Sequence, residues 1–270
     1  MNAVGGADRF DVVSADGTPI AVWVEGEGVP LVLFHGAMSD HTTYRPLVSE
    51  LRDGVATFAV DRRGRGASGD SPAYAIEREF DDVAAVVDAV AEQVGGRPVA
   101  MWGHSYGADV AMGGCALTDR ASHLLLYEPG LGMSYPPGSV EKVEACLAAG
   151  DREGAVEAVL RDVVEMTDDE VAMLHASPAW ALRVAAAHTV PRELSGESGW
   201  VYRPGQFDAI GAHALVLSGS ESPAEQQEAT RRAAAAIPNA RVHVLEGHGH
   251  AAHQTDPAAV AAVVRDVLAS

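Results

Sequence analysis

The segment Gly103–Gly107, with the sequence Gly-His-Ser-Tyr-Gly, constrains the fold of this chain more than any other feature. An apolar run, Pro98–Trp102, precedes it, and a segment of small residues, Ala108–Leu117, follows it and favours a helix. Gly-x-Ser-x-Gly between a strand and a helix is typical of a nucleophile elbow, a sharp turn that holds a serine in a strained conformation. The glycines avoid clashes with neighbouring backbone. The motif predicts a strand–turn–helix unit that exposes the Ser105 hydroxyl above a sheet edge.

Short apolar runs alternate with helical patterns along most of the chain. We expect strands at Phe10–Ser14, Pro19–Glu25, Leu31–Phe34, Thr57–Val60, Pro98–Trp102, Leu124–Tyr127, Ala214–Ser218 and Val242–Leu245. Helical patterns cover Tyr44–Arg52, Glu79–Val94, Ser105–Leu117, Ala224–Ala236 and Pro257–Leu268. This alternation predicts an α/β fold, an eight-stranded and mostly parallel sheet flanked by helices. The turn at Ala15–Thr18 adds an antiparallel hairpin at one edge.

One long segment, 131–208, contains no convincing strand pattern. Its helical patterns are Val140–Ala149, Arg152–Glu165 and Asp168–Thr189, and its turn signals are Pro136–Gly138, Ser195–Gly199 and Arg203–Gly205. We therefore predict a helical cap at 131–208, inserted after the sixth strand. The core of the fold then consists of residues 1–130 and 209–270.

Composition narrows the range of partners. The 270 residues carry a formal net charge of −19, which disfavours nucleic acid and anionic membranes as partners. No apolar run approaches the roughly 20 residues that span a bilayer, and the first residues do not resemble a signal peptide, so we expect a cytoplasmic protein. Two cysteines, Cys115 and Cys146, are too few for a disulfide framework. The composition leaves the oligomeric state open.

A serine hydroxyl needs a base that accepts its proton and a partner that orients this base. His250 is the preferred base, because it follows the last strand in a loop that can reach the turn at Ser105. His248 and His253 are alternatives. The three histidines also resemble a metal cluster, but no acidic ligand accompanies them, so we expect neither a metal nor another cofactor.

Two loops could supply the acid behind the base. Glu128 directly follows the sixth apolar run, where a carboxylate is costly to bury without a partner, and this favours it. Glu221, after the seventh run, is the alternative. Glu128 could instead cap a helix or dock the cap, and the site could lack an acid altogether.

Attack on a carbonyl also creates an oxyanion, which requires preorganised N–H donors. The loop His35–Met38 follows the third strand, and its Ala37 amide is one candidate donor. The amide of Tyr106, which follows Ser105 at the start of a helix, is the other. We expect His35 to brace this loop rather than act as a second base.

The chain resembles the α/β-hydrolase superfamily over nearly its whole length. The resemblance rests on Phe34–Gly36, on Asp61–Ser68, on Gly103–Gly107 and on Gly249-His250. It implies the order Ser105, Glu128, His250 for nucleophile, acid and base, and a mainly architectural role for Asp61–Ser68, although an anion site of arginines is an alternative. Most relatives carry an aspartate where this chain has Ser222. Some haloalkane dehalogenase-like members carry a glutamate after the sixth strand instead, and Glu128 fits that variant.

Serine rather than aspartate in the elbow indicates an acyl-enzyme. We predict a serine hydrolase that cleaves a small, neutral or hydrophobic ester or lactone, with a small-molecule substrate as its partner. Alternatives are hydrolysis of a carbon–carbon bond in a dione and binding or tailoring of a metabolite without hydrolysis. The candidate substrate-binding residues in the cap are Trp180, His188 and Trp200, with Tyr202 and Phe207 as further candidates.

Overall fold

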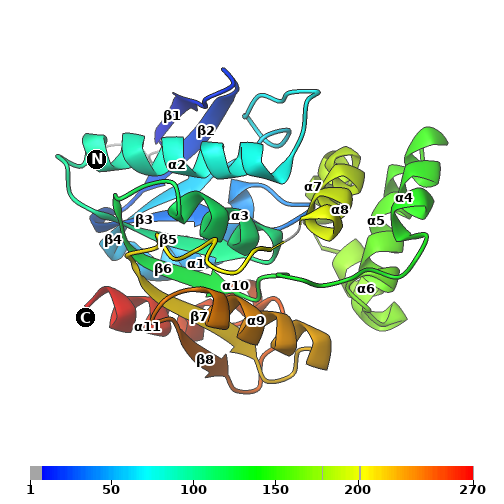
Figure 1. The fold of residues 1–270 in the computed structure, drawn as a ribbon. Coiled ribbons are helices and arrows are strands. Elements are labelled where there is room, and N and C mark those ends of the chain that lie inside the picture. The colour runs from blue at the N-terminus through cyan, green and yellow to red at the C-terminus, as the bar shows by residue number, and fades with distance from the viewer. Residues whose placement is uncertain (1–7, 178, 201, 270) are drawn as a thin grey trace, which may run out of the picture.

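An eight-stranded sheet forms the centre of the computed structural model, which describes residues 8–177, 179–200 and 202–269 (Figure 1). Its strand order is β1-β2-β4-β3-β5-β6-β7-β8. The bounds are β1 Asp8–Val13, β2 Pro19–Glu25, β3 Glu27–Phe34, β4 Asp53–Val60, β5 Val99–His104, β6 Ala121–Tyr127, β7 His213–Gly219 and β8 Arg241–Leu245. Among these eight described strands, the β1–β2 and β2–β4 pairs are antiparallel and the other neighbouring pairs are parallel. The predicted mostly parallel sheet with an antiparallel edge is confirmed.

Two strands are longer than their apolar runs. β3 begins four residues before Leu31 and β4 four residues before Thr57, and these leading halves are largely exposed. They pair with each other, so that Gly28 lies opposite Gly54. A Cβ on Gly28 would lie 2.1 Å from the Gly54 carbonyl oxygen, so a side chain is excluded there. Apolar runs therefore mark only the part of a strand that helices cover on both faces.

Helices cover both faces of the sheet. α2 (Ile76–Gln93), α3 (Tyr106–Cys115) and α9 (Ala224–Ala236) pack on one face, and α1 (Arg45–Leu51), α10 (Ala252–Thr255) and α11 (Pro257–Leu268) pack on the other. A short 3₁₀ helix, η1 (His41–Tyr44), precedes α1. The valines of α2 lie on its buried face, as their helical spacing predicts. Two apolar clusters, one on each face, hold the layers together.

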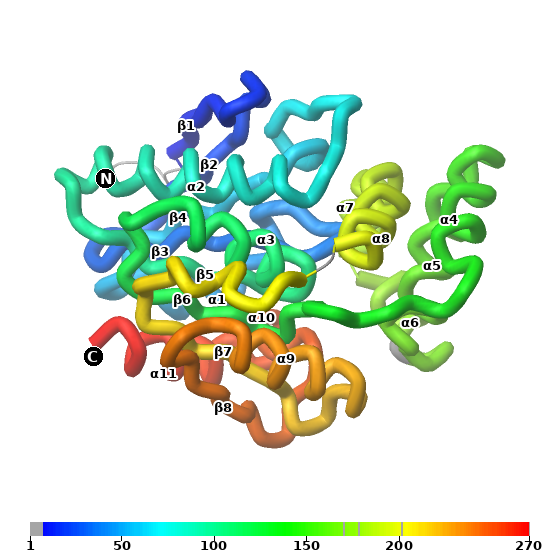
Figure 2. The backbone as a smooth tube through the Cα atoms, viewed as in Figure 1, coloured from blue at the N-terminus to red at the C-terminus, as the bar shows by residue number. Residues whose placement is uncertain are grey.

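A helical insertion separates β6 from β7, as predicted. Its elements are α4 (Ser139–Ala148), α5 (Arg152–Asp162), α6 (Asp168–His175), α7 (Ala179–Ala186), the 3₁₀ helix η2 (Ala187–Thr189) and α8 (Val190–Gly199). In Figure 2 the chain leaves the sheet after β6, forms these helices beside the core and returns to β7. The insertion has its own apolar cluster, which also includes Met38 of the core. We call Ser139–Gly199 the helical insertion.

Two local expectations in this insertion are wrong. The single helix expected over Asp168–Thr189 is divided into α6, α7 and η2. The expected turn at Ser195–Gly199 is the second half of α8. Relative to alanine, glycine costs about 1 kcal/mol in a helix interior and serine costs less, so the burial of Glu193 and Glu197 in α8 can outweigh this local preference.

No helix in the described part of the chain is both long and apolar enough to cross a membrane.

Candidate active site

Ser105 occupies the turn between β5 and α3, with φ 54° and ψ −131°. A positive φ is strained for a residue other than glycine. A Cβ on Gly107 would lie 2.3 Å from the Phe34 carbonyl oxygen, and one on Gly103 would lie 2.5 Å from the Gly107 carbonyl oxygen. Both positions therefore require glycine. The strand–turn–helix unit predicted from the sequence is confirmed.

Glu128 follows β6 directly, and its side chain is fully buried. Its Oε2 lies 2.6 Å from His250 Nδ1, and its Oε1 accepts a 2.7 Å hydrogen bond from the Gly219 amide at the end of β7. Its backbone has φ 50°, a second strained position near Ser105. The carboxylate thus connects the carboxyl ends of β6 and β7 to the loop after β8.

The environment of Glu128 favours its charged form. Burial alone would raise its pKa, but the hydrogen bond with His250, the charge of that imidazole and the Gly219 amide together hold the pKa of the carboxyl below its usual value. A charged carboxylate beside Nδ1 keeps a proton on that nitrogen. The Nε2 atom of His250 is then the nitrogen that can accept a proton.

Three histidines gather next to Ser105. His104 donates a 2.8 Å hydrogen bond from Nε2 to the His250 carbonyl, and the two ring centroids are 4.6 Å apart. His253 is fully buried, with its ring centroid 4.2 Å from that of His104, and burial lowers its pKa to about 3. His248 instead lies 3.7 Å from Asp256. Of the candidate bases His248, His250 and His253, His250 is therefore the one that contacts Glu128.

Within residues 8–177, 179–200 and 202–269, no hydrogen bond joins the Ser105 hydroxyl to the His250 imidazole. Both side chains are partly exposed. Catalytic hydrogen bonds are often long or poorly aligned in free enzymes and shorten when substrate binds. The contact of His250 with His104, the residue before Ser105, nevertheless brings the imidazole to the same end of β5.

The two predicted amide donors come from two different elements next to Ser105. The loop that bears Ala37 follows β3, and a Cβ added to Gly36 would lie 3.1 Å from the Ser105 Cβ. Tyr106 is the first residue of α3, where N–H groups have no acceptor within the helix. His35 braces the loop, since it accepts a 3.2 Å hydrogen bond from the Arg62 amide.

The alternative acid lies differently. Glu221 is exposed, and its amide donates a 2.9 Å hydrogen bond to the His248 carbonyl. Among the described residues, its carboxylate contacts no histidine. Ser222, where most relatives are expected to carry aspartate, is buried and offers no carboxylate.

The loop Asp61–Ser68 is architectural, as the resemblance implied. Asp61 accepts 2.9 Å hydrogen bonds from the Trp23 ring and from the backbone amides of His41 and Ala67. The three arginines of the loop are paired with carboxylates: Arg62 with Glu79 and Glu193, Arg63 with Asp16 and Asp82, and Arg65 with Glu193. These pairs disfavour the alternative of an anion site formed by the loop.

A buried pair of carboxyl groups between the core and the helical insertion was not predicted from the sequence. Asp109 of α3 and Glu197 of α8 face each other, and the Tyr135 hydroxyl donates to Glu197. Burial raises the pKa of Asp109 to about 6. Burial and the nearby charge of Asp109 raise the pKa of Glu197 well above its usual value. The pair therefore holds a proton at neutral pH. No local pattern predicts this pair, because Glu197 lies within an apparent turn, Ser195–Gly199.

We expect this pair to make stability depend on pH. Because the folded-state pKa of Asp109 exceeds its unfolded value near 4, its contribution is complete below about pH 4 and is lost as pH rises through about 6; the raised pKa of Glu197 acts in the same direction. Between pH 5 and pH 8 the wild type should lose roughly 2 kcal/mol of unfolding free energy from this source. Glu197→Gln keeps an acceptor for Tyr135 and should flatten this dependence in urea unfolding. An unchanged slope in the variant would contradict the assignment.

The predicted substrate-binding residues occupy different environments. Trp180 is buried in the apolar cluster of the insertion, against His175. His188 is exposed, accepts a 2.8 Å hydrogen bond from Arg152 at Nδ1 and lines a pocket. Trp200 packs on Phe80 of α2. Tyr202 and Phe207 stack on each other with ring centroids 5.6 Å apart. Their roles in substrate binding stay predictions.

Within the described part of the chain, one group of possible metal ligands occurs, formed by Asp40, His41 and Asp61, whose ligand atoms lie within 4.8 Å of one another. Asp61 already accepts several hydrogen bonds, and Asp40 caps η1 through the Thr42 amide at 2.9 Å. This group is therefore explained as part of the architecture of the loops.

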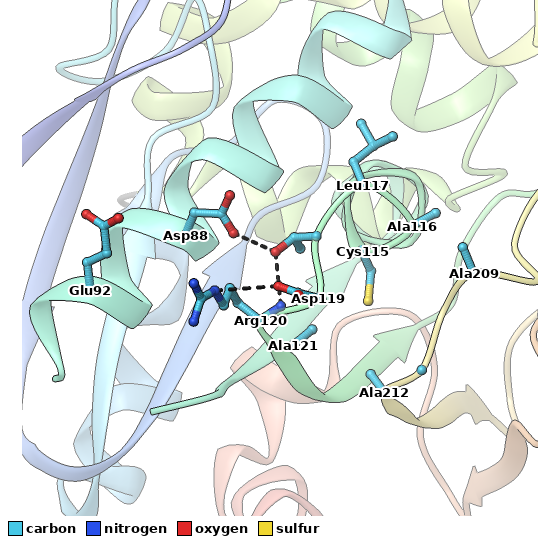
Figure 3. Close-up of a pocket in the computed structure, with 12 residues that line it drawn as sticks. Asp88, Glu92, Cys115, Ala116, Leu117, Asp119, Arg120, Ala121, Ala209 and Ala212 are labelled. Carbon is cyan, nitrogen blue, oxygen red and sulfur yellow. Dashed lines mark hydrogen bonds and ion pairs between the residues drawn. The ribbon is translucent and has the colours of Figure 1, made fainter. Parts of the chain in front are cut away.

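Two pockets lie outside the turn at Ser105. The larger, about 690 Å³, lies where β6 begins, at the opposite end of that strand from Glu128; Figure 3 shows Asp88, Cys115 and Arg120 in its wall. The smaller, about 400 Å³, lies between α7 and the loops after β3 and β4. Its lining includes Ser39, Asp40, Arg65, Leu182, Ala186 and His188.

The chain is similar to known proteins over most of its length. A model of the alpha/beta hydrolase family matches residues 31–263. The crystal structure of an alpha/beta hydrolase from Sphaerobacter thermophilus is 34% identical, covers 96% of this chain and 100% of its own, and superimposes with a TM-score of 0.83. The enol-lactonase from Burkholderia xenovorans has the same fold, with 22% identity, a TM-score of 0.77, and coverage of 97% of this chain and 100% of its own.

A third relative matches only a segment. The 2-(acetamidomethylene)succinate hydrolase of Mesorhizobium japonicum is 36% identical over 86 residues, which are 31% of this chain and 29% of that protein. The family model, by contrast, covers most of the chain, including Ser105, Glu128 and His250. The protein therefore belongs to the alpha/beta hydrolase family.

Proposed function

We propose that this protein is a serine hydrolase that cleaves a carboxylic ester or a lactone of a small molecule through an acyl-enzyme. The observation that carries the proposal is the Glu128–His250 pair beside the strained turn at Ser105. One protein with the same fold is an enol-lactonase, and the relative that matches over 86 residues is a 2-(acetamidomethylene)succinate hydrolase; both names support this reaction class.

In the proposed mechanism, Ser105 Oγ attacks the carbonyl carbon while His250 Nε2 accepts the hydroxyl proton. Glu128 holds the imidazole through Nδ1 and stabilises its charged form. The Ala37 and Tyr106 amides donate to the oxyanion. His250 then gives the proton to the leaving alcohol oxygen. Water, deprotonated by His250, attacks the acyl-enzyme, and the carboxylic acid leaves as Ser105 regains its proton.

We also propose that residues 131–208 form a cap over the site and that residues 1–130 and 209–270 form the catalytic core. Met38, one residue after Ala37, belongs to the apolar cluster of the helical insertion, which supports this arrangement. Trp180 and His188, in and beside α7, are proposed to shape the substrate pocket together with Trp200.

Labelling with a fluorophosphonate probe tests the proposed nucleophile. Such probes form a stable bond with an activated serine, so the wild type should take up about one label per chain, on the peptide that contains Ser105. Ser105→Ala should take up none. Ser198→Ala, which removes a hydroxyl bonded to its own helix at the Leu194 carbonyl, is the matched control and should label like the wild type. Equal labelling of Ser105→Ala would overturn the proposal.

A further inference from the structure

Among the described residues of the helical insertion, Arg183 is a half-buried cation without a partner. The other cationic side chains there are engaged: Lys142 with Asp162, Arg152 with the Val184 and Ala185 carbonyls, Arg161 with Asp168, and Arg192 with Asp70. Arg183 has neither a carboxylate nor a hydrogen-bond acceptor within the described residues, and its Nε atom is buried. A buried charge is costly unless an anion accompanies it, so an unpaired guanidinium requires an explanation.

The helix that carries Arg183 faces the loops around Ser105. Trp180, one turn earlier on α7, shares an apolar cluster with Met38, which follows the predicted oxyanion donor Ala37. Leu182 and Ala186 line the pocket above the loops after β3 and β4. Residue 183 lies between these two faces on a helical projection. Figure 1 shows α7 and α8 next to the core, with α4 and α5 farther out.

The charge of Arg183 also reaches the histidines of the site. It is one of the causes, after burial and the neighbouring histidines, that lower the pKa of His104 and His253. These two rings lie against each other, and His104 lies against His250. The guanidinium of Arg183 therefore lies within electrostatic range of the histidines beside Ser105.

We propose that Arg183 binds a carboxylate of the substrate, so that the enzyme acts on esters or lactones that carry a second, free carboxylate. A planar guanidinium fits a carboxylate through two parallel hydrogen bonds. The inference rests on the proposed function and replaces the expectation of a neutral or hydrophobic substrate. The net charge of −19 is a property of the whole chain and does not describe the local field at Arg183.

A pair of esters of equal size tests the proposal. Mono-p-nitrophenyl glutarate carries the carboxylate, and p-nitrophenyl 5-methylhexanoate replaces it with an isopropyl group. The wild type should favour the anionic ester in kcat/KM, and Arg183→Leu should reduce the ratio of the two values by roughly 30-fold, mainly through KM. Arg183→Lys should retain part of the preference. Arg161→Leu, on the same insertion but paired with Asp168, is the control and should leave the ratio unchanged.

Binding without turnover provides an independent measurement. Glutarate should raise the melting temperature of the wild type and of Ser105→Ala but not of Arg183→Leu, and inorganic phosphate at equal concentration should have a smaller effect. An unchanged ester ratio in Arg183→Leu, or equal stabilisation of that variant by glutarate, would overturn the role of Arg183. If Ser105→Ala is inactive at the same time, the proposed hydrolase stands. If Ser105→Ala remains active while Arg183→Leu loses glutarate binding, the anion site stands and the proposed nucleophile fails.

Discussion

Ser105→Ala is expected to lower kcat for hydrolysis of p-nitrophenyl acetate by about 10⁵-fold or more, because removal of the nucleophile from a serine triad abolishes the covalent route. The remaining rate would come from the amide donors and from substrate binding. KM should change little, since alanine occupies less space than serine and leaves the pocket intact. The measurement is steady-state release of p-nitrophenolate by the purified variant, compared with wild type and with buffer alone.

This experiment requires a check that the variant folds and a control variant at another serine. Alanine can occupy the Ser105 position only at the same positive φ, so the variant must be shown to fold by its unfolding midpoint. Ser198→Ala, in the helical insertion, should retain wild-type activity. Hydrolysis by Ser105→Ala at the wild-type rate would remove the basis of the proposed mechanism.

Local sequence patterns predicted those parts of the molecule in which the structure requires a particular residue type at a particular position. The glycines at 103 and 107 are required because a Cβ would meet backbone oxygen, and that is visible in sequence as a fixed spacing around Ser105. Glu128 could be selected because a carboxylate directly after a buried strand needs a partner, and the structure supplies two, His250 and Gly219. The mostly parallel sheet with its antiparallel edge also followed from the alternation of strand and helix patterns and from the turn at Ala15–Thr18, whereas the strand order did not.

Long-range pairing accounts for what the sequence did not show. α8 is a helix because Glu193 reaches Arg62 and Arg65, which lie more than a hundred residues earlier in the chain. Local preference cannot report such contacts. The Asp109–Glu197 pair and the unpartnered Arg183 depend in the same way on how the insertion lies on the core. The substrate class was therefore the least predictable property.

Glu128→Gln is expected to lower kcat by about 10⁴-fold near neutral pH, through the proton it places on His250 rather than through any loss of packing. The amide keeps an oxygen for the Gly219 N–H, but its NH₂ group would donate to Nδ1. The imidazole would then carry its proton on Nε2, the nitrogen that must accept the proton of Ser105. Binding should change less than turnover, so kcat rather than KM is the sensitive quantity.

Glu221→Gln distinguishes this tautomer effect from a general loss of negative charge near the loop after β8. Glu221 is exposed and only its backbone amide contacts that loop, so this variant should keep activity within about twofold of wild type. The two variants remove one carboxylate each from neighbouring strand ends, yet one carboxylate touches His250 and the other does not. Equal losses of activity in the two variants would show that negative charge near His250, rather than direct contact with its imidazole, supports catalysis. A loss confined to Glu221→Gln would assign the role of acid to Glu221.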